Sequence, residues 1–164
     1  MSADSAQVAP ELVPVVRRYM NDVPHNRALG LRVVDFARDF FTVELPYDPR
    51  LVGNPETGVL HGGVITAAMD SASGGAVLVA LDRPQRIVTL DLRIDYLRAA
   101  TPHEAVVCRA SCYKAGYHVA FTRAVAYHDD PAAPIATASG TFVIFRTPPP
   151  TAAGGPDGSE GAAT

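Results

Sequence analysis

This sequence has no excess of basic residues. It is therefore not expected to belong to the proteins that bind their partners mainly through positive charge. The 164 residues include 14 Lys and Arg against 17 Asp and Glu, which gives a formal net charge of −3. Binding to nucleic acid or to an anionic membrane surface normally uses a clustered excess of positive charge. We therefore expect a small-molecule partner, and neither nucleic acid nor a membrane.

Cysteine is scarce as well. The two cysteines, Cys108 and Cys112, lie four residues apart in a strand-like segment. At the rise of a β-strand this spacing separates them by about 13 Å, which is beyond disulfide reach. No Cys-x-x-Cys pair and no histidine at ligand spacing accompanies them, so we expect reduced thiols and no metal site.

Long apolar runs are limited to one internal segment, residues 62–81. The first residues show no basic region followed by an apolar run and a small-residue cleavage site, so we expect a soluble cytoplasmic protein. The length suits one domain with a sizeable core. We assign this domain to residues 10–146, between a disordered start at 1–9 and a disordered Pro-, Gly- and Ala-rich tail at 147–164.

Segment 62–81 is the feature around which the chain is organised. Nearly all of its residues are apolar or small, so it has no polar face and predicts a buried helix. Asp70 is its only charge. A carboxylate in a dry interior costs free energy unless it is paired or hydrogen-bonded. Structural hydrogen bonds would account for Asp70, but the adjoining glycines and His61 favour a functional role.

The remaining pattern predicts mainly strands. Residues 10–20 have Leu12, Val13, Val16 and Tyr19 at helical spacing, residues 21–27 read as a turn, and 46–60 as a loop. Strands are expected at 29–38, 40–45, 86–97, 103–114, 117–128 and 135–145, the last three as an antiparallel meander. Alternation in segment 89–96 predicts one face against the helix, formed by Leu90, Leu92, Ile94 and Tyr96.

The start of the central helix has the features of an oxyanion-binding site. A helix N-terminus carries unpaired N–H groups and partial positive charge, and Gly62 and Gly63 let a ligand oxygen approach the backbone. Asp70 lies eight residues further on, about 12 Å along the helix axis from Gly62. One chain therefore cannot bring both groups to the same carbonyl, but a symmetric dimer could.

These residues resemble the hotdog-fold acyl-CoA thioesterases of the PaaI type, in the 4-hydroxybenzoyl-CoA thioesterase superfamily. The resemblance covers residues 29–145 and rests on Asn54, the triplet His61-Gly62-Gly63, Asp70 and segments 89–98 and 138–142. It implies an α+β fold, in which a curved antiparallel sheet wraps a long central helix. It also implies homodimers, often paired into tetramers, with interfacial sites that hydrolyse acyl-CoA without a metal or organic cofactor.

The resemblance also implies roles for five residues. Asp70 is expected to be the general base or nucleophile, and the Gly62 N–H the oxyanion donor. Asn54 is expected near the reacting centre, His61 at the helix start with a possible bond to substrate, and Thr89 as a hydroxyl that positions water. For the last three, an ordinary turn, helix-start or strand residue is the structural alternative.

Candidate substrate-binding residues are Gly63, Ser71, Arg98, Lys114 and Gly116. Two features depart from the family pattern. The segment from Asn54 to His61 is one residue longer, and the turn expected to carry basic residues after its glycine, for the coenzyme A phosphates, has its charge before it, at Lys114.

Two other functions fit the same fold. A hotdog domain could bind or sense acyl-CoA without turnover, although the retained Asp70 favours an enzyme. A hotdog dehydratase or hydratase would instead carry an Asp and His pair on the loop and at the helix start.

Overall fold

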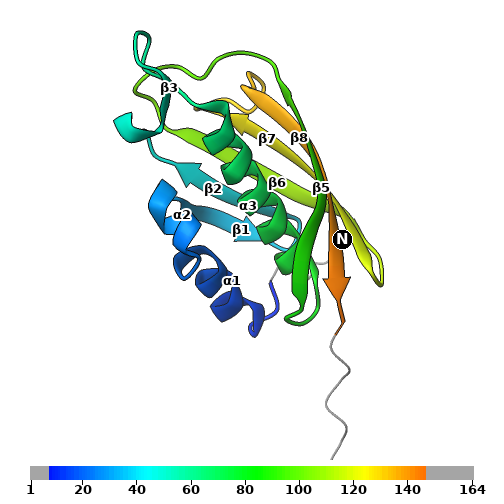
Figure 1. The fold of residues 1–164 in the computed structure, drawn as a ribbon. Coiled ribbons are helices and arrows are strands. Elements are labelled where there is room, and N and C mark those ends of the chain that lie inside the picture. The colour runs from blue at the N-terminus through cyan, green and yellow to red at the C-terminus, as the bar shows by residue number, and fades with distance from the viewer. Residues whose placement is uncertain (1–7, 147–164) are drawn as a thin grey trace, which may run out of the picture.

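The computed structural model describes residues 8–146 (Figure 1). Of the two predicted tails, residues 1–7 of the first (1–9) and the whole of the second (147–164) lie outside this range. The elements follow in the order α1 (Leu12–Asn21), α2 (Pro24–Leu29), β1 (Arg32–Ala37), β2 (Phe40–Leu45), a 3-10 turn η2 (Pro49–Leu51), β3 (Val52–Asn54), β4 (Val59–Leu60), α3 (Gly62–Ala80), β5 (Arg86–Tyr96), β6 (Val106–Ala115), β7 (Val119–Tyr127) and β8 (Ala136–Phe145).

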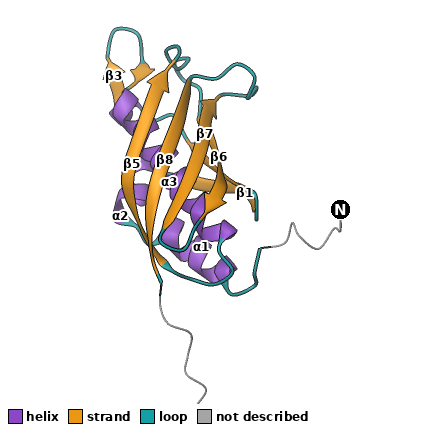
Figure 2. Ribbon diagram, turned by 90° about the vertical axis from the view of Figure 1, so that its right-hand side faces the viewer, coloured by secondary structure: helices purple, strands orange, loops and turns teal. Residues whose placement is uncertain are grey.

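Six strands form one antiparallel sheet in the order β1-β2-β6-β7-β8-β5. The sheet wraps around α3, which runs across its inner face (Figures 1 and 2). This arrangement confirms the predicted α+β hotdog fold, the central helix and the meander of the last three strands. It leaves β5 as one edge of the sheet, next to α3.

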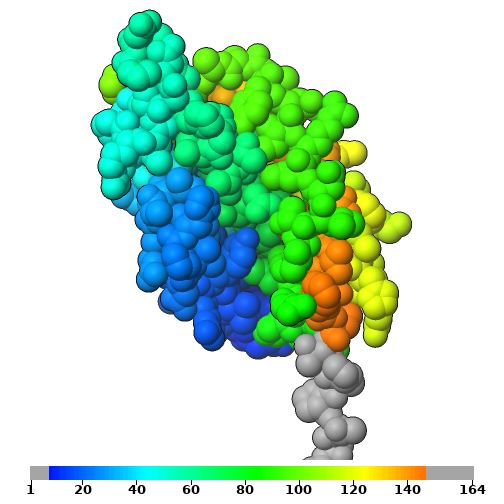
Figure 3. All heavy atoms as spheres, viewed as in Figure 1, coloured from blue at the N-terminus to red at the C-terminus, as the bar shows by residue number. Residues whose placement is uncertain are grey.

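The N-terminal helices pack against α3. The predicted amphipathic helix is confirmed, since α1 buries Leu12, Val16 and Met20. The predicted turn at residues 21–27 is wrong, because Pro24 starts the short helix α2 and Gly30, at φ +69°, ends it. The first strand consequently begins at residue 32 and not at 29. Figure 3 shows the blue atoms of α1 and α2 packed against the green atoms of α3.

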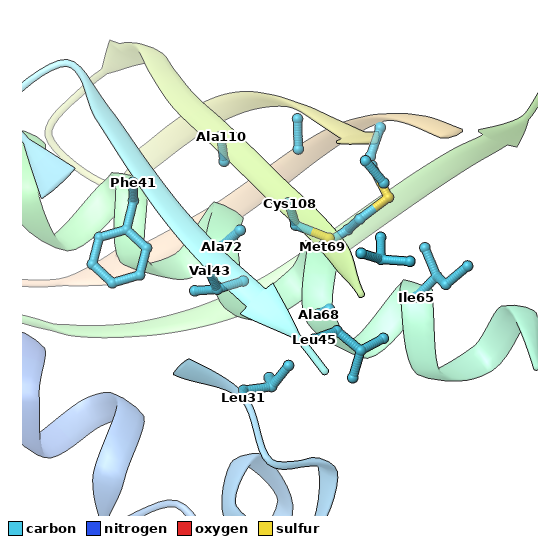
Figure 4. Close-up of a cluster of buried hydrophobic side chains, with 14 of the residues drawn as sticks. Leu31, Phe41, Val43, Leu45, Ile65, Ala68, Met69, Ala72, Cys108 and Ala110 are labelled. Atoms are coloured by element: carbon cyan, nitrogen blue, oxygen red, sulfur yellow. The ribbon is translucent and has the colours of Figure 1, made fainter. Parts of the chain in front are cut away.

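The core lies between α3 and the inner face of the sheet. Met69 and Ala72 of α3 are fully buried beside Val43 of β2 and Cys108 of β6 (Figure 4). By length and composition α3 could cross a membrane, but 67% of the tested segment is buried inside the fold. The cysteines are free, as predicted, and burial raises the pKa of the Cys108 thiol to about 12.

The predicted loop at residues 46–60 contains a small hairpin, β3–β4, that leads into α3. Its register shifts at Gly53, which leaves Asn54 opposite Val59. Gly53 lies against His61, since a Cβ on Gly53 would come within 2.8 Å of the His61 Cα. The close approach of these two backbones requires glycine at this position.

A bulge in β5 changes which residues face α3. Thr89 pairs with the buried Phe142 and Asp91 with Thr141, so Leu90 is the extra residue. The prediction that Leu90 faces the helix is wrong, because its side chain is 65% exposed. Before the bulge, Ile87 and Thr89 lie on the inner face. After it, Leu92, Ile94 and Tyr96 do, as predicted.

Candidate active site

Four residues of α3 with small or polar side chains recur at four-residue intervals and so lie on one face of the helix: Gly62, Thr66, Asp70 and Gly74. We call this row the α3 stripe. Side chains from β5 and α1 contact it: Tyr96 at Gly62 and Thr66, Thr89 at Asp70, and Tyr19 at Gly74. Gly62, Thr66 and Asp70 are partly exposed and face the edge strand β5, whereas Gly74 is buried beneath Tyr19.

Asp70 lies half-buried in the middle of the stripe. The Thr89 hydroxyl donates a hydrogen bond of 2.9 Å to Asp70 Oδ1. Burial raises the pKa of the Asp70 carboxyl, and the bond from Thr89 partly opposes that rise. A carboxylate with a raised pKa accepts a proton more readily than an exposed one, which suits a general base near neutral pH.

The first turn of α3 leaves one N–H group unpaired. His61 is the N-cap, and its Nδ1 accepts a hydrogen bond of 2.9 Å from the Gly63 N–H. Within residues 8–146, no acceptor pairs with the Gly62 N–H. This free donor lies at the positive end of the helix, where a developing negative charge is stabilised. The contacts place His61 as a cap and Gly62 as the open donor.

Tyr96 anchors this first turn and was not among the predicted site residues. Its hydroxyl donates to the Gly62 carbonyl at 2.6 Å and lies 2.8 Å from the Thr66 Oγ1. The alternation of segment 89–96 correctly pointed Tyr96 towards the helix. Its hydrogen bonds could not be found from the sequence, because Tyr96 is 34 residues from Gly62.

One chain does not bring the oxyanion donor and the carboxylate together. Gly62 and Asp70 lie on one uninterrupted helix, about 12 Å apart along its axis. A separate pocket of about 320 Å³ lies beside Gly62 and is lined in part by Leu60, Tyr96 and Arg98.

Asn54 lies on the hairpin and not beside Asp70. Its Oδ1 accepts a hydrogen bond of 3.0 Å from the Glu56 N–H, and its carbonyl accepts one of 2.9 Å from the Gly58 N–H. These contacts hold the β3–β4 turn. The side chain is exposed.

Ser71 points away from the stripe. It is 7% exposed, and its hydroxyl donates to Asn26 Oδ1 at 3.1 Å. Asn26 in turn donates to the Tyr19 carbonyl at 3.3 Å. The structure therefore places Ser71 in a contact between α3 and the N-terminal helices.

The remaining candidate substrate-binding residues are Arg98, Lys114 and Gly116. Arg98 lies at one end of the sheet, and Lys114 and Gly116 lie at the other. Arg98 lies near Gly62 and donates to the Ala133 carbonyl at 2.9 Å. Lys114 and Gly116 lie at the β6–β7 turn, where Arg146 donates to the Gly116 carbonyl at 3.0 Å. That turn is near the C-terminal end of α3, so one chain does not gather these residues into a single phosphate site.

No cluster of three His, Cys, Asp or Glu residues that could hold a metal ion occurs within residues 8–146. The expectation that no organic cofactor takes part stays a prediction.

The fold is of the hotdog type, and the comparisons with known proteins identify a hydrolase of this type. The sequence matches the thioesterase superfamily over residues 57–135. It is also 33% identical over 139 residues to the medium/long-chain acyl-CoA thioesterase YigI of Escherichia coli K12, a match that covers 77% of this chain and 88% of that protein. The chain therefore belongs to the thioesterase superfamily.

Solved structures share this fold. A Pseudomonas aeruginosa crystal structure matches with a TM-score of 0.74 and 42% identity, covering 80% of this chain and 98% of that one. A Haemophilus influenzae thioesterase matches with a TM-score of 0.70, over 82% of this chain and 90% of that one. At 22% identity, this second match supports the fold alone.

Proposed function

We propose that this protein hydrolyses acyl-CoA thioesters, with medium- or long-chain acyl groups, by the chemistry of the PaaI-type enzymes. The observation that carries the proposal is the half-buried Asp70, oriented by Thr89 and facing the sheet edge and not the core. The name of the Escherichia coli relative supports the substrate class.

In this mechanism the Asp70 carboxylate takes a proton from water while the water oxygen bonds to the thioester carbonyl carbon. The carbonyl oxygen becomes an oxyanion, and a Gly62 N–H stabilises it. The C–S bond then breaks, and the proton passes to the departing coenzyme A thiolate. In the nucleophilic alternative, the Asp70 carboxylate attacks the carbonyl carbon and the C–S bond breaks to release the coenzyme A thiolate. Water then hydrolyses the resulting anhydride, which frees the fatty acid and regenerates Asp70. Thr89 orients Asp70 in both routes.

We further propose a homodimer, or a dimer of dimers, in which the Gly62 N–H of the partner subunit approaches Asp70. The separation of about 12 Å along α3 is too large for one carbonyl to contact both groups of the same chain. The β5 edge offers a surface for pairing, since it exposes apolar side chains that include Val88, at 49%, and Leu90, at 65%. An unpaired apolar edge strand readily pairs with another chain.

The activity is tested with a panel of acyl-CoA thioesters, from acetyl- to octadecanoyl-CoA, by the release of free coenzyme A thiol. We expect turnover with the longer acyl groups of this panel. Saturable binding without thiol release from any member would contradict the proposal and favour the acyl-CoA binding or sensing alternative.

The shared site is tested by mixing two inactive variants. Gly62→Pro removes the N–H at the first helical residue, where proline is tolerated. His61, at φ −63° and ψ 132°, already has the extended backbone required before proline. Gly62→Ala, which keeps the N–H, is the control.

Asp70→Asn and Gly62→Pro, mixed in equal amounts and refolded together, should regain about a quarter of the wild-type activity. Half of the randomly formed dimers are hybrids, and each hybrid holds one intact site. If mixing restores nothing while native mass spectrometry detects hybrid dimers, each site is built from one chain and the proposal of a shared site is wrong.

A further inference from the structure

An apolar groove of about 430 Å³ lies between the N-terminal helices, the end of α3 and the start of β5. Its lining is mainly hydrophobic, with the residues Val15, Tyr19, Val23, Pro24, Leu78 and Ile87. In Figure 3 the blue atoms of α1 and α2 meet the green atoms of α3 and β5 along this region. Apolar pockets of this size commonly hold small-molecule ligands.

The groove continues the α3 stripe beyond Asp70. Leu78 lies eight residues, or about two turns, after Asp70 on the same helix face. On β5, Ile87 lies two residues before Thr89 and therefore on the same face of the strand. The Asp70–Thr89 pair and the Leu78–Ile87 pair thus lie on the same faces of the same two elements.

Tyr19 stands between these two pairs. A Cβ built on Gly74, the stripe residue between Asp70 and Leu78, would lie 2.5 Å from the Tyr19 hydroxyl oxygen. Glycine at position 74 therefore leaves the space that the tyrosine occupies. Burial, and next the negative charge of Asp70, raise the pKa of the Tyr19 phenol, so it stays neutral at physiological pH.

We propose that this groove binds the acyl chain of the substrate and that Tyr19 determines the chain length that it accepts. The inference rests on the proposed function and names a specificity-determining residue for it. A short acyl group ends at the Tyr19 ring, and a longer one displaces the ring from Gly74 to reach Leu78 and Ile87.

The chemistry of the groove favours an acyl chain over the coenzyme A moiety. Its interior is apolar, whereas coenzyme A carries several phosphate charges. The charged residues that line it are Arg18, Asp22 and Arg86. Arg18 pairs with Asp22 at 3.3 Å, and the Arg86 guanidinium lies over the Phe145 ring, 4.2 Å from its centroid. One cation left unpaired within residues 8–146 is a small charge for several phosphates, and the rest of the lining is mainly apolar, so an uncharged hydrocarbon chain is the occupant that fits.

Three variants test the proposal with acyl-CoA substrates from butanoyl- to octadecanoyl-CoA. Tyr19→Ala opens the groove, Tyr19→Phe removes only the hydroxyl above Gly74, and Ile87→Trp fills the far end. Tyr113→Ala is the matched control, because Tyr113 is exposed and lies near Arg123, away from the groove. Thermal unfolding verifies that each variant folds.

For Tyr19→Ala we expect the ratio of kcat/KM for octadecanoyl-CoA to that for butanoyl-CoA to rise by about tenfold or more. Tyr19→Phe should raise it less, Ile87→Trp should lower it, and Tyr113→Ala should leave it unchanged. Folded Tyr19→Ala and Ile87→Trp proteins that keep the wild-type ratio would overturn the proposal.

A second measurement separates this proposal from the proposed function. The affinities of S-alkyl-CoA thioethers, which cannot be hydrolysed, are measured by calorimetry for the same variants. If the wild type hydrolyses nothing but Tyr19→Ala shifts binding towards longer alkyl chains, the groove proposal stands and the hydrolase proposal fails. If the variants hydrolyse acyl-CoA but show the same dependence on chain length as the wild type, in both binding and turnover, the groove proposal fails and the hydrolase proposal stands.

Discussion

Replacing Asp70 by Asn tests the central chemical claim with the smallest change in shape. The Asn side-chain oxygen can still accept the hydrogen bond from Thr89, which is 2.9 Å long in the wild type. The substitution removes the negative charge and the ability to take up a proton. We therefore expect kcat to fall by about 10²–10⁴-fold, the usual contribution of a general base.

Substrate binding should change far less than turnover, because the carboxylate acts on water and on the reacting carbonyl. The assay is release of free coenzyme A thiol, together with calorimetric affinity for an S-alkyl-CoA thioether. Asp91→Asn is the control, since Asp91 is an exposed carboxylate just after the bulge in β5. It should keep the wild-type kcat.

Stability provides a second readout, and its sign follows from the raised pKa of Asp70. Because burial raises this pKa in the folded state, the folded protein holds the proton more tightly than the unfolded chain does. The free energy of unfolding therefore decreases as pH rises from the unfolded pKa, near 3.8, through the folded pKa. The Asn side chain does not ionise, so the Asp70→Asn variant does not lose this free energy of unfolding as pH rises. Its Tm at neutral pH should therefore equal or exceed that of the wild type.

Two results would refute this reasoning. A folded Asp70→Asn protein with a kcat within about threefold of wild type would exclude Asp70 as the base. A variant that fails to fold would show that Asp70 is a structural residue, held by its hydrogen bond to Thr89.

Three further substitutions have defined outcomes. Thr89→Val removes the hydrogen bond that lowers the pKa of Asp70, so the acidic limb of the kcat/KM profile should move to higher pH; an unchanged limb would contradict this role. Tyr96→Phe removes a hydrogen bond of 2.6 Å to the first turn of α3 and should lower kcat by about fivefold to tenfold, with little change in Tm, in steady-state and unfolding measurements. Gly75→Ala would place a Cβ 2.3–2.6 Å from three ring carbons of Phe41; urea unfolding should show a loss of about 1–3 kcal/mol, and a variant as stable as wild type would refute the tight packing.

The sequence alone determined the features that depend on local pattern. The segment at 62–81 was identified as the central helix because all its faces are apolar, and α3 spans Gly62–Ala80. Segments rich in β-forming residues predicted the last four strands, and short connections predicted the meander of β6, β7 and β8. The carboxylate was found for a similar reason, since Asp70 is the only charge in an otherwise apolar run.

The tertiary structure decided what each of these residues contacts. The bulge at Leu90 turns Thr89 towards Asp70, a reversal that no alternation pattern reveals because it depends on pairing with β8. Ser71, next to Asp70 in sequence, donates a hydrogen bond to Asn26 of α2, a helix in a segment for which the sequence pattern predicts a turn.

The groove likewise could not be predicted from the sequence. Tyr19 and Gly74 are 55 residues apart, and nothing at either position indicates that the Tyr19 phenol occupies the space that Gly74 leaves open. Hydrophobic periodicity reports which face of an element is buried. It does not report which distant side chain covers that face, and the site is built from such contacts.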